Sequence, residues 1–376
     1  MSNEPIFVTR PTLPDLESFN QLLSQIWSTH TLTNCGPLHN RLEADLAKYL
    51  GVPYISLFNN GTSALVAALQ ALDLPKGSEI ITTPFSFVAT SHSIIWNDCM
   101  PVFVDVDGVT CNIDINMVES AITHKTSGIL GVHCYGNPCD VDALSKISRK
   151  YGVKLLYDAA HAFGVEKDGE SILNFGDVSA LSFHATKVFS TIEGGAVVSH
   201  SLEVKQKIDR LRNFGIQDEV TVSSLGLNGK MSEVHAAYGL LQLQNIDSSI
   251  YKRGEIEKVY RSLLNKIPSI SLLQYPNNVK SNGSYFPIFI SPSAKLNRDE
   301  VYAELKKNNI FARRYFYPLI TEMEPYKSDP KYRLIHPLNV ATQIADQVLC
   351  LPIYPDISIE QVELICELLY DWLKDA

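Results

Sequence analysis

One lysine of the chain lies where it could do covalent chemistry. Lys187 is part of the stretch 182–195, between two short apolar runs, 178–181 and 196–198, that are typical of buried strands. A lysine amine forms a Schiff base with a carbonyl only in its neutral form, and an ordinary lysine has a pKa of about 10.4. Burial or a nearby cation would lower that pKa. A solvated lysine in a surface loop is the alternative, and Lys187 alone does not decide between the two.

A second cluster, in the turn 58–64, predicts an anion site. Gly61, Thr62 and Ser63 follow an apolar run and open a helical segment. Free backbone N–H groups and the helix dipole favour a phosphate at such a helix start. The two hydroxyls could add hydrogen bonds. A capped strand-to-helix turn without any ligand would have the same residues.

An acid, a histidine and an aromatic residue follow two further apolar runs. Asp158 ends the run 154–157. A buried aspartate needs a cationic partner, and the protonated pyridine nitrogen of pyridoxal phosphate is one; a helix N-cap is the alternative. His161 could reach the same ligand or have a structural role. Phe87 follows the run 79–83 and could stack on a cofactor ring or belong to the core.

The elements that must position these residues alternate between strands and helices. Seven short apolar runs, with helical segments between them, predict a mostly parallel seven-stranded sheet covered on both faces. The runs are residues 54–58, 79–83, 102–106, 128–133, 154–157, 179–183 and 196–198. Ligands bind beyond the carboxyl ends of the strands in such a sheet. Lys187, Asp158 and the turn 58–64 all fall there, which favours a shared cofactor site over separate packing roles.

The pattern changes after residue 201. We expect helices over 202–214 and 232–267, the second long and bent, then a short strand near 284–290 and a helix after Asn297. The last helix, 358–373, begins with a capping box formed by Ser358 and Gln361. Because the chain of 376 residues exceeds the size of a single core, we predict a large domain, 1–247, with an N-terminal arm, and a smaller C-terminal α+β domain, 248–376.

Composition excludes several classes of function. The net charge of −9 without a basic run argues against nucleic acid as a partner. No apolar run approaches the roughly 20 residues of a membrane span, and no apolar leader is evident. The seven cysteines are scattered without a CxxC pair, so we expect reduced thiols and no metal site. These features predict a cytoplasmic enzyme, and an anionic small substrate remains compatible with them.

Over nearly its whole length, the chain resembles the sugar aminotransferases of the DegT/DnrJ/EryC1/StrS family. The likeness is carried by residues 60–65, 84–90, 158–161, 182–187, 193–195 and 228–233. It implies an α/β fold of the PLP-dependent transferase type I (aspartate aminotransferase-like) class. It also implies pyridoxal 5′-phosphate (PLP) as cofactor and a homodimer with shared active sites.

The resemblance implies roles around the cofactor ring. Lys187 would form the Schiff base, Asp158 would lie under the pyridine nitrogen and His161 near the phenolic oxygen. Phe87 would stack on the ring. Many relatives have glutamine at the position of His161. Relatives with histidine in place of the lysine are dehydratases, and Lys187 argues against that reaction here.

The resemblance also implies how the cofactor phosphate is held. Ser182 would contact it, together with the amides of Thr62 and Ser63 in the turn that begins at Gly61. Asn228 would reach the phosphate of the cofactor in the other subunit. The phosphate site would therefore be complete only in the dimer.

For the substrate, the resemblance implies contacts from Asn34, His184, Arg314 and Tyr317. Residues 34–37, 157–164 and 313–319 look most like enzymes that aminate C4 of dTDP-4-keto-6-deoxy-D-glucose for O-antigen or surface glycan biosynthesis, with L-glutamate as the amino donor. Amination at C3 and a UDP- or GDP-linked substrate are the enzymatic alternatives. A non-catalytic regulator that binds the cofactor or sugar is a further one.

Overall fold

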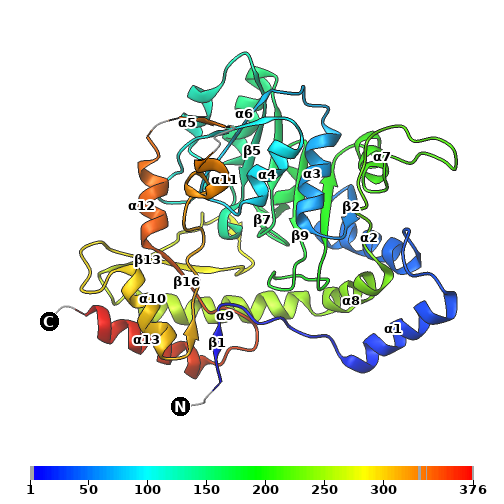
Figure 1. Cartoon of the computed structure of the whole chain (residues 1–376). Coiled ribbons are helices and arrows are strands. Elements are labelled where there is room, and N and C mark those ends of the chain that lie inside the picture. Colours follow the sequence, from blue (N-terminus) through cyan, green and yellow to red (C-terminus); the bar gives the residue numbers. More distant parts are fainter. Residues whose placement is uncertain (1–3, 329–331, 336, 375–376) are drawn as a thin grey trace.

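The computed structural model describes residues 4–328, 332–335 and 337–374, and its centre is an eight-stranded sheet (Figure 1). In spatial order the strands are β15 (Arg333–Leu334), β4 (Met100–Phe103), β3 (Glu79–Thr82), β5 (Thr126–Val132), β6 (Lys154–Asp158), β9 (Val178–Ser182), β10 (Gly195–Ser199) and β2 (Tyr54–Phe58). All pairs are parallel except those of β10, which is antiparallel to both β9 and β2. The seven predicted strands are present, and the short β15 adds an eighth at one edge.

Helices cover both faces of this sheet, as the apolar runs predict. Adjacent residues of one strand, Ile80 and Ile81, belong to two different hydrophobic clusters because successive side chains point to opposite faces. The helices on the Ile80 side are α3 (Gly61–Ala71), α4 (Ala89–Trp96) and α7 (Leu202–Leu211). Those on the Ile81 side are α2 (Pro37–Leu50), α5 (Ile115–Ala121), α6 (Val141–Tyr151) and α8 (Glu233–Gln244).

The C-terminal part is built on a second, antiparallel sheet. Its strands are β11 (Ile270–Leu272), β13 (Phe286–Ile290) and β16 (Val348–Leu351). The helices around it are α9 (Ile246–Leu264), α10 (Arg298–Lys307), α12 (Asn339–Gln347) and α13 (Ile359–Leu373). The capping box predicted at Ser358 and Gln361 is confirmed, and a second one joins Asn297 to Glu300. The helix expected over 232–267 is two helices, because the chain leaves helical geometry at Asn245 between α8 and α9.

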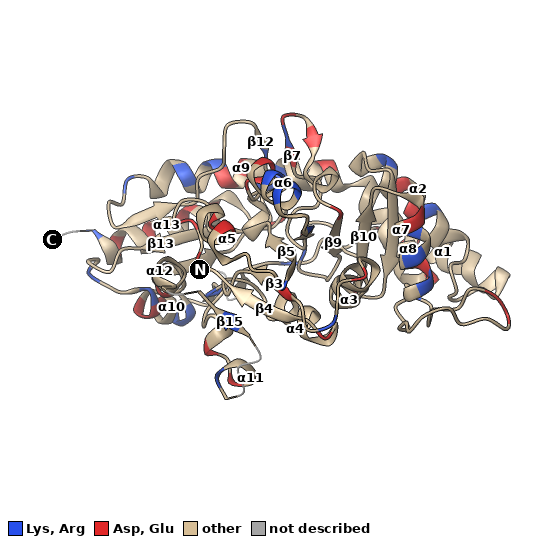
Figure 2. Cartoon of the chain, turned by 90° about the horizontal axis from the view of Figure 1, so that it is seen from above, with Lys and Arg blue, Asp and Glu red and all other residues tan. Residues whose placement is uncertain are grey.

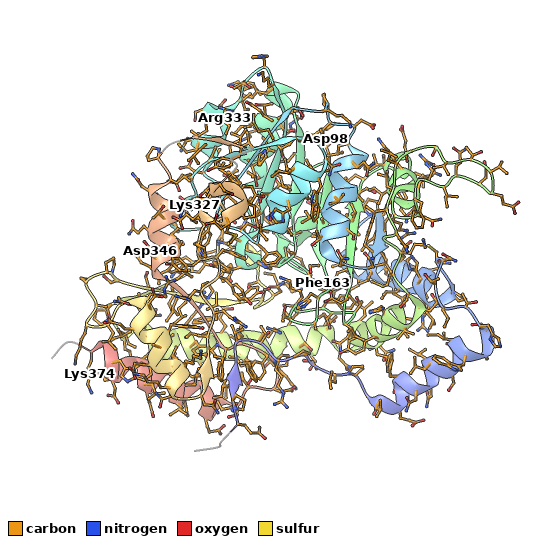
Figure 3. The ribbon with its side chains drawn as sticks, viewed as in Figure 1. Asp98, Phe163, Lys327, Arg333, Asp346 and Lys374 are labelled. Carbon is orange, nitrogen blue, oxygen red and sulfur yellow. The ribbon has the colours of Figure 1, made fainter. Side chains whose placement is uncertain are left out.

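Two contacts tie the ends of the chain to distant elements. Near the N-terminus, β1 (Ile6–Phe7) pairs in parallel with β14 (Ile310–Phe311). Near the C-terminus, Arg333 of β15, labelled in Figure 3, forms an ion pair of 3.0 Å with the buried Glu79 of the large sheet. The arm therefore packs on the C-terminal part, and a C-terminal strand joins the large sheet. The division at residue 247 stays a prediction.

The remaining elements are short or lie at the surface. They are α1 (Leu16–Thr29), α11 (Glu324–Lys327), β7 (Glu166–Lys167), β8 (Glu170–Ser171), β12 (Val279–Lys280) and 3-10 turns at Cys134–Gly136, Ile172–Asn174 and Ile320–Glu322. Acidic and basic residues are interspersed along the outer helices, among them α2, α7 and α9 (Figure 2). Among the described residues, no helix combines the length and apolarity needed to cross a membrane.

Candidate active site

A cavity of about 450 Å³ lies beyond the carboxyl ends of the central strands, where the C-terminal part meets the large sheet. Both parts of the chain line it. Eight of the residues singled out from the sequence are in its lining: Gly61, Thr62, Phe87, Asp158, His161, Ser182, His184 and Lys187. These residues come from separate strand ends and turns, and the parallel sheet brings them together.

Lys187 lies in the turn after β9, partly buried in the cavity wall. Its backbone N–H donates to the carbonyl of His184 at 2.9 Å, which fixes the turn. Burial lowers the pKa of the Lys187 amine to about 8, and the nearby charge of Asp158 opposes this shift. A substantial fraction of the amine is then neutral near pH 8. The amine is suited to attack a carbonyl or to exchange protons.

Asp158 ends β6 and is 5 % exposed. One carboxylate oxygen accepts a hydrogen bond of 2.7 Å from the Thr90 hydroxyl, which lies 2.7 Å from the hydroxyl of Ser86. The other accepts one of 3.1 Å from the backbone N–H of Ala160. Burial raises the pKa of Asp158, while these hydrogen bonds and the charge of Lys187 oppose the shift. Among the described residues, no basic side chain pairs with this carboxylate.

His161 is held as a neutral ring. Its Nδ1 accepts a hydrogen bond of 3.2 Å from the backbone N–H of Tyr135, so Nε2 carries the proton of the neutral tautomer. The imidazole stacks on Phe316 with ring centroids 5.8 Å apart and planes at 4°. Burial and the positive charge of Lys187 lower the pKa of His161 well below its ordinary value. His161 can therefore donate one hydrogen bond in the cavity.

The start of α3 forms the predicted anion site, with one difference. The side chain of Asn60 caps the helix by accepting the backbone N–H of Ser63 at 2.8 Å, so this amide is already bonded. The first N–H groups of a helix have no partner inside it, and those of Gly61 and Thr62 remain for an anion. A Cβ on Gly61 would lie 2.8 Å from the Cβ of Ser182. Glycine therefore lets the helix start approach the end of β9.

Phe87 and His184 lie at more open positions of the lining. Phe87 is 62 % exposed although it precedes a well-packed helix, so its ring is accessible from the cavity. The Nδ1 atom of His184 lies 2.8 Å from the Thr186 hydroxyl, and its Nε2 lies 3.7 Å from the carboxylate of Glu193. Both positions are compatible with ligand contacts.

Four lining residues come from the C-terminal part and were not singled out from the sequence: Tyr285, Arg313, Tyr315 and Phe316. Three of them belong to the run 313–319 noted in the sequence, in which Arg314 and Tyr317 were the predicted substrate contacts. Arg314 instead pairs with Asp299 at 2.8 Å. Its guanidinium lies 5.3 Å from the ring centroid of Tyr317, and neither residue is in the lining. Within one chain, Arg313 lines the cavity and Arg314 does not, and the predicted substrate contacts of Arg314 and Tyr317 stay predictions.

Asn34 and Asn228 lie outside the lining and are exposed. Asn34 has a left-handed backbone (φ 63°) in the loop before α2. The backbone carbonyl of Asn228 accepts a hydrogen bond of 3.1 Å from the side chain of Asn59, which places it beside the turn that leads to α3. Their predicted ligand contacts stay predictions.

The chain is similar to known proteins of one family. Residues 15–370 match the DegT/DnrJ/EryC1/StrS aminotransferase family. The dTDP-4-amino-4,6-dideoxy-D-glucose transaminase of Shigella dysenteriae is 52 % identical, with 96 % of this chain and 97 % of the relative aligned. The Escherichia coli transaminase of the same name is 50 % identical, with coverage of 98 % and 99 %.

Solved structures agree with this relationship. The crystal structure of DesI in the presence of its TDP-sugar product superposes with a TM-score of 0.92 at 33 % identity, covering 98 % of this chain and 92 % of DesI. The large, mostly parallel sheet is consistent with the type I fold of PLP-dependent transferases. The chain belongs to the DegT/DnrJ/EryC1/StrS family and is an aminotransferase.

Proposed function

We propose that the protein is a PLP-dependent transaminase that moves the amino group of L-glutamate to C4 of dTDP-4-keto-6-deoxy-D-glucose. The product would be dTDP-4-amino-4,6-dideoxy-D-glucose, for O-antigen or another surface glycan. The two bacterial transaminases described above support the substrate. The observation that supports the reaction type is a lysine of lowered pKa that shares one cavity with a buried carboxylate, for which the described residues provide no basic partner.

The residues of the cavity fit the cofactor. The Asp158 carboxylate is buried without a basic partner among the described residues, which suits the protonated nitrogen of a pyridine ring. The accessible ring of Phe87 offers a stacking surface. The N–H groups of Gly61 and Thr62, with the hydroxyl of Ser182, suit a phosphate. When bound, the cofactor supplies an electron sink for the charge that develops at the reacting carbon.

The side chains of the cavity would have different roles in the reaction. Lys187 would hold the cofactor through Nζ and, once released, take the proton from Cα of glutamate, which its pKa near 8 permits. Asp158 would keep the pyridine nitrogen protonated through its negative charge. His161 would donate its Nε2 proton as a hydrogen bond while remaining uncharged. The surrounding aromatic rings would exclude water from these proton transfers.

Arg313 gives the cavity a positive group for the substrates. Among the described residues its guanidinium has no ion-pair partner, whereas the neighbouring Arg314 is bonded to Asp299. Glutamate and a nucleotide sugar are both anions, and the chain as a whole carries a net charge of −9. A local cation is therefore needed to attract them. We assign this role to Arg313.

We also propose a homodimer with shared active sites. The loop between α7 and α8 extends away from the body of the molecule (Figure 1), and it exposes Val220 (93 %) and Leu225 (85 %). Apolar side chains exposed together are typical of protein interfaces. In the dimer, Asn228 at the base of this loop would reach the partner's cofactor phosphate. The seven cysteines are free, which fits our proposal of a cytoplasmic enzyme.

The test is turnover with L-glutamate and a panel of nucleotide-linked 4-keto and 3-keto sugars. We expect conversion of dTDP-4-keto-6-deoxy-D-glucose, with nitrogen at C4 of the product by NMR. Preference for a 3-keto sugar or for a UDP- or GDP-linked sugar would refute the assigned substrate. A protein that binds cofactor but converts no sugar and exchanges no amino group with glutamate would refute catalysis.

A further inference from the structure

The cavity places one tyrosine hydroxyl beside the reactive lysine. Lys187 Nζ donates a hydrogen bond to the hydroxyl oxygen of Tyr285 at 3.5 Å, and Nζ lies 5.6 Å from the centroid of the same ring. Among the described residues, no other side chain accepts a hydrogen bond from this amine. Tyr285 precedes β13, so the contact joins the C-terminal part to the turn after β9.

The ring of Tyr285 is fixed by its aromatic neighbours. It meets His161 edge to face, with centroids 4.8 Å apart and planes at 65°. Tyr315 packs against it at 5.4 Å and Tyr135 at 6.1 Å, both also edge to face. Because these contacts surround a buried ring, the hydroxyl cannot leave Lys187 without displacing the wall of the cavity.

The backbone before Tyr285 is fixed as well. The side-chain amide of Asn282 donates to the carbonyls of His161 and Phe163 at 2.8 and 2.9 Å. The buried Arg253 donates to the carbonyl of Gly283 at 3.2 Å. Gly283 has φ +59°, and a Cβ there would lie 2.8 Å from the Cβ of Arg253, so glycine is required at this turn. The segment therefore holds the tyrosine at a set place relative to the large sheet.

We propose that Tyr285 is a positioning residue whose hydroxyl holds the amine of Lys187 in the cavity whenever that amine is protonated and free of the cofactor. The proposal rests on the proposed function, because it takes Lys187 to be the reacting amine. Burial raises the pKa of Tyr285 far above its ordinary value, so the hydroxyl stays uncharged. It acts through a hydrogen bond rather than as an acid or base.

The hydrogen bond between Lys187 and Tyr285 is expected to change the pKa of the lysine in one direction. A hydrogen bond accepted from the ammonium form stabilises that form and raises the pKa of the lysine. From the hydrogen bond we expect the Tyr285 hydroxyl to act in the same direction as the charge of Asp158, which opposes the lowering that burial causes. Removing the hydroxyl while keeping the ring should lower the pKa of Lys187 further.

The first test measures that pKa in the full-length protein freed of cofactor. Lys187 is labelled with acetic anhydride at a series of pH values, and the labelled peptide is quantified by mass spectrometry. For Tyr285→Phe we expect the labelling curve to move to lower pH by about 0.5 to 1 unit. The matched control is Tyr315→Phe, which loses a hydroxyl from the same wall but makes no hydrogen bond to Lys187, and its curve should not move. Melting curves verify that each protein is folded.

The second test uses the holoenzyme. A positioning role predicts that Tyr285→Phe lowers kcat of the glutamate half-reaction about 5- to 20-fold, with KM for glutamate nearly unchanged. An unmoved labelling curve for Tyr285→Phe, or an equal shift for Tyr315→Phe, would overturn the proposal. The labelling requires no sugar and no cofactor. A failure of the proposed substrate would therefore leave this result standing, and the two failures can be told apart.

Discussion

Replacing Asp158 by asparagine tests the role that we propose for its carboxylate at the ring nitrogen of the cofactor. Asparagine has the same shape, and its carbonyl oxygen can still accept the hydrogen bond from Thr90 or Ala160. The protein should therefore fold and bind cofactor. What is lost is the buried negative charge that, in the proposed function, faces the protonated ring nitrogen of the cofactor. Leaving one member of a buried ion pair alone costs about 3–5 kcal/mol. If this cost falls on the transition state, the rate decreases by a factor of roughly 10²–10⁴.

The assay is the glutamate half-reaction, followed by the absorbance change of the bound cofactor in a stopped-flow instrument. The matched control is Asp105→Asn. Asp105 is another buried carboxylate, but it bonds to the backbone N–H groups of Val340 and Ala341 and lies outside the cavity. We expect it to cost stability while changing the rate less than about threefold. A near-normal rate for Asp158→Asn with full cofactor occupancy would refute the assigned role of the carboxylate.

Three further predictions concern the substrates, the pH dependence and the dimer. Arg313→Gln should raise KM for glutamate and for the sugar nucleotide at least about tenfold, whereas Arg314→Gln should change either by less than about twofold; equal effects would contradict the assignment. Thr90→Val removes a hydrogen bond that lowers the pKa of the Asp158 carboxylate. The acidic limb of the plot of rate against pH should therefore move to higher pH by up to about one unit. An acidic limb that does not move would contradict this prediction. Lys187→Ala and Asn228→Asp subunits, each inactive alone, should regain activity when mixed, and inactive heterodimers would place Asn228 outside the partner's site.

The strands of the large sheet could be predicted because each is a nearly uninterrupted apolar run, which a strand buried on both faces requires. The exception is β15, Arg333–Leu334, which has only two residues and no such run. It joins the sheet through tertiary contacts, among them the ion pair of Arg333 with Glu79, and no local pattern indicates them. The bend predicted in the helix 232–267 is a complete break at Asn245, and the sequence does not indicate it because apolar residues are buried on both sides, among them Leu241 in α8 and Ile246 in α9.

The centre of the site was predictable because the carboxyl ends of parallel strands meet at one edge. Lys187 and Asp158 share the cavity for that reason. Which of Arg313 and Arg314 lines the cavity of one chain was not predictable, because the segment is irregular and no hydrophobic periodicity indicates which of two neighbours faces it. Tyr285 was also missed, since an aromatic residue just before a strand has the pattern of an ordinary core residue.

The central claim, that the cavity is a transamination site built around Lys187, is tested most directly by trapping the cofactor. The native protein is reduced with borohydride and digested, and the peptides that carry the cofactor are identified by mass spectrometry. We predict that the cofactor is attached at Lys187, in the peptide that contains residues 182–195. Attachment at another lysine, with Lys187 unmodified, would contradict the account.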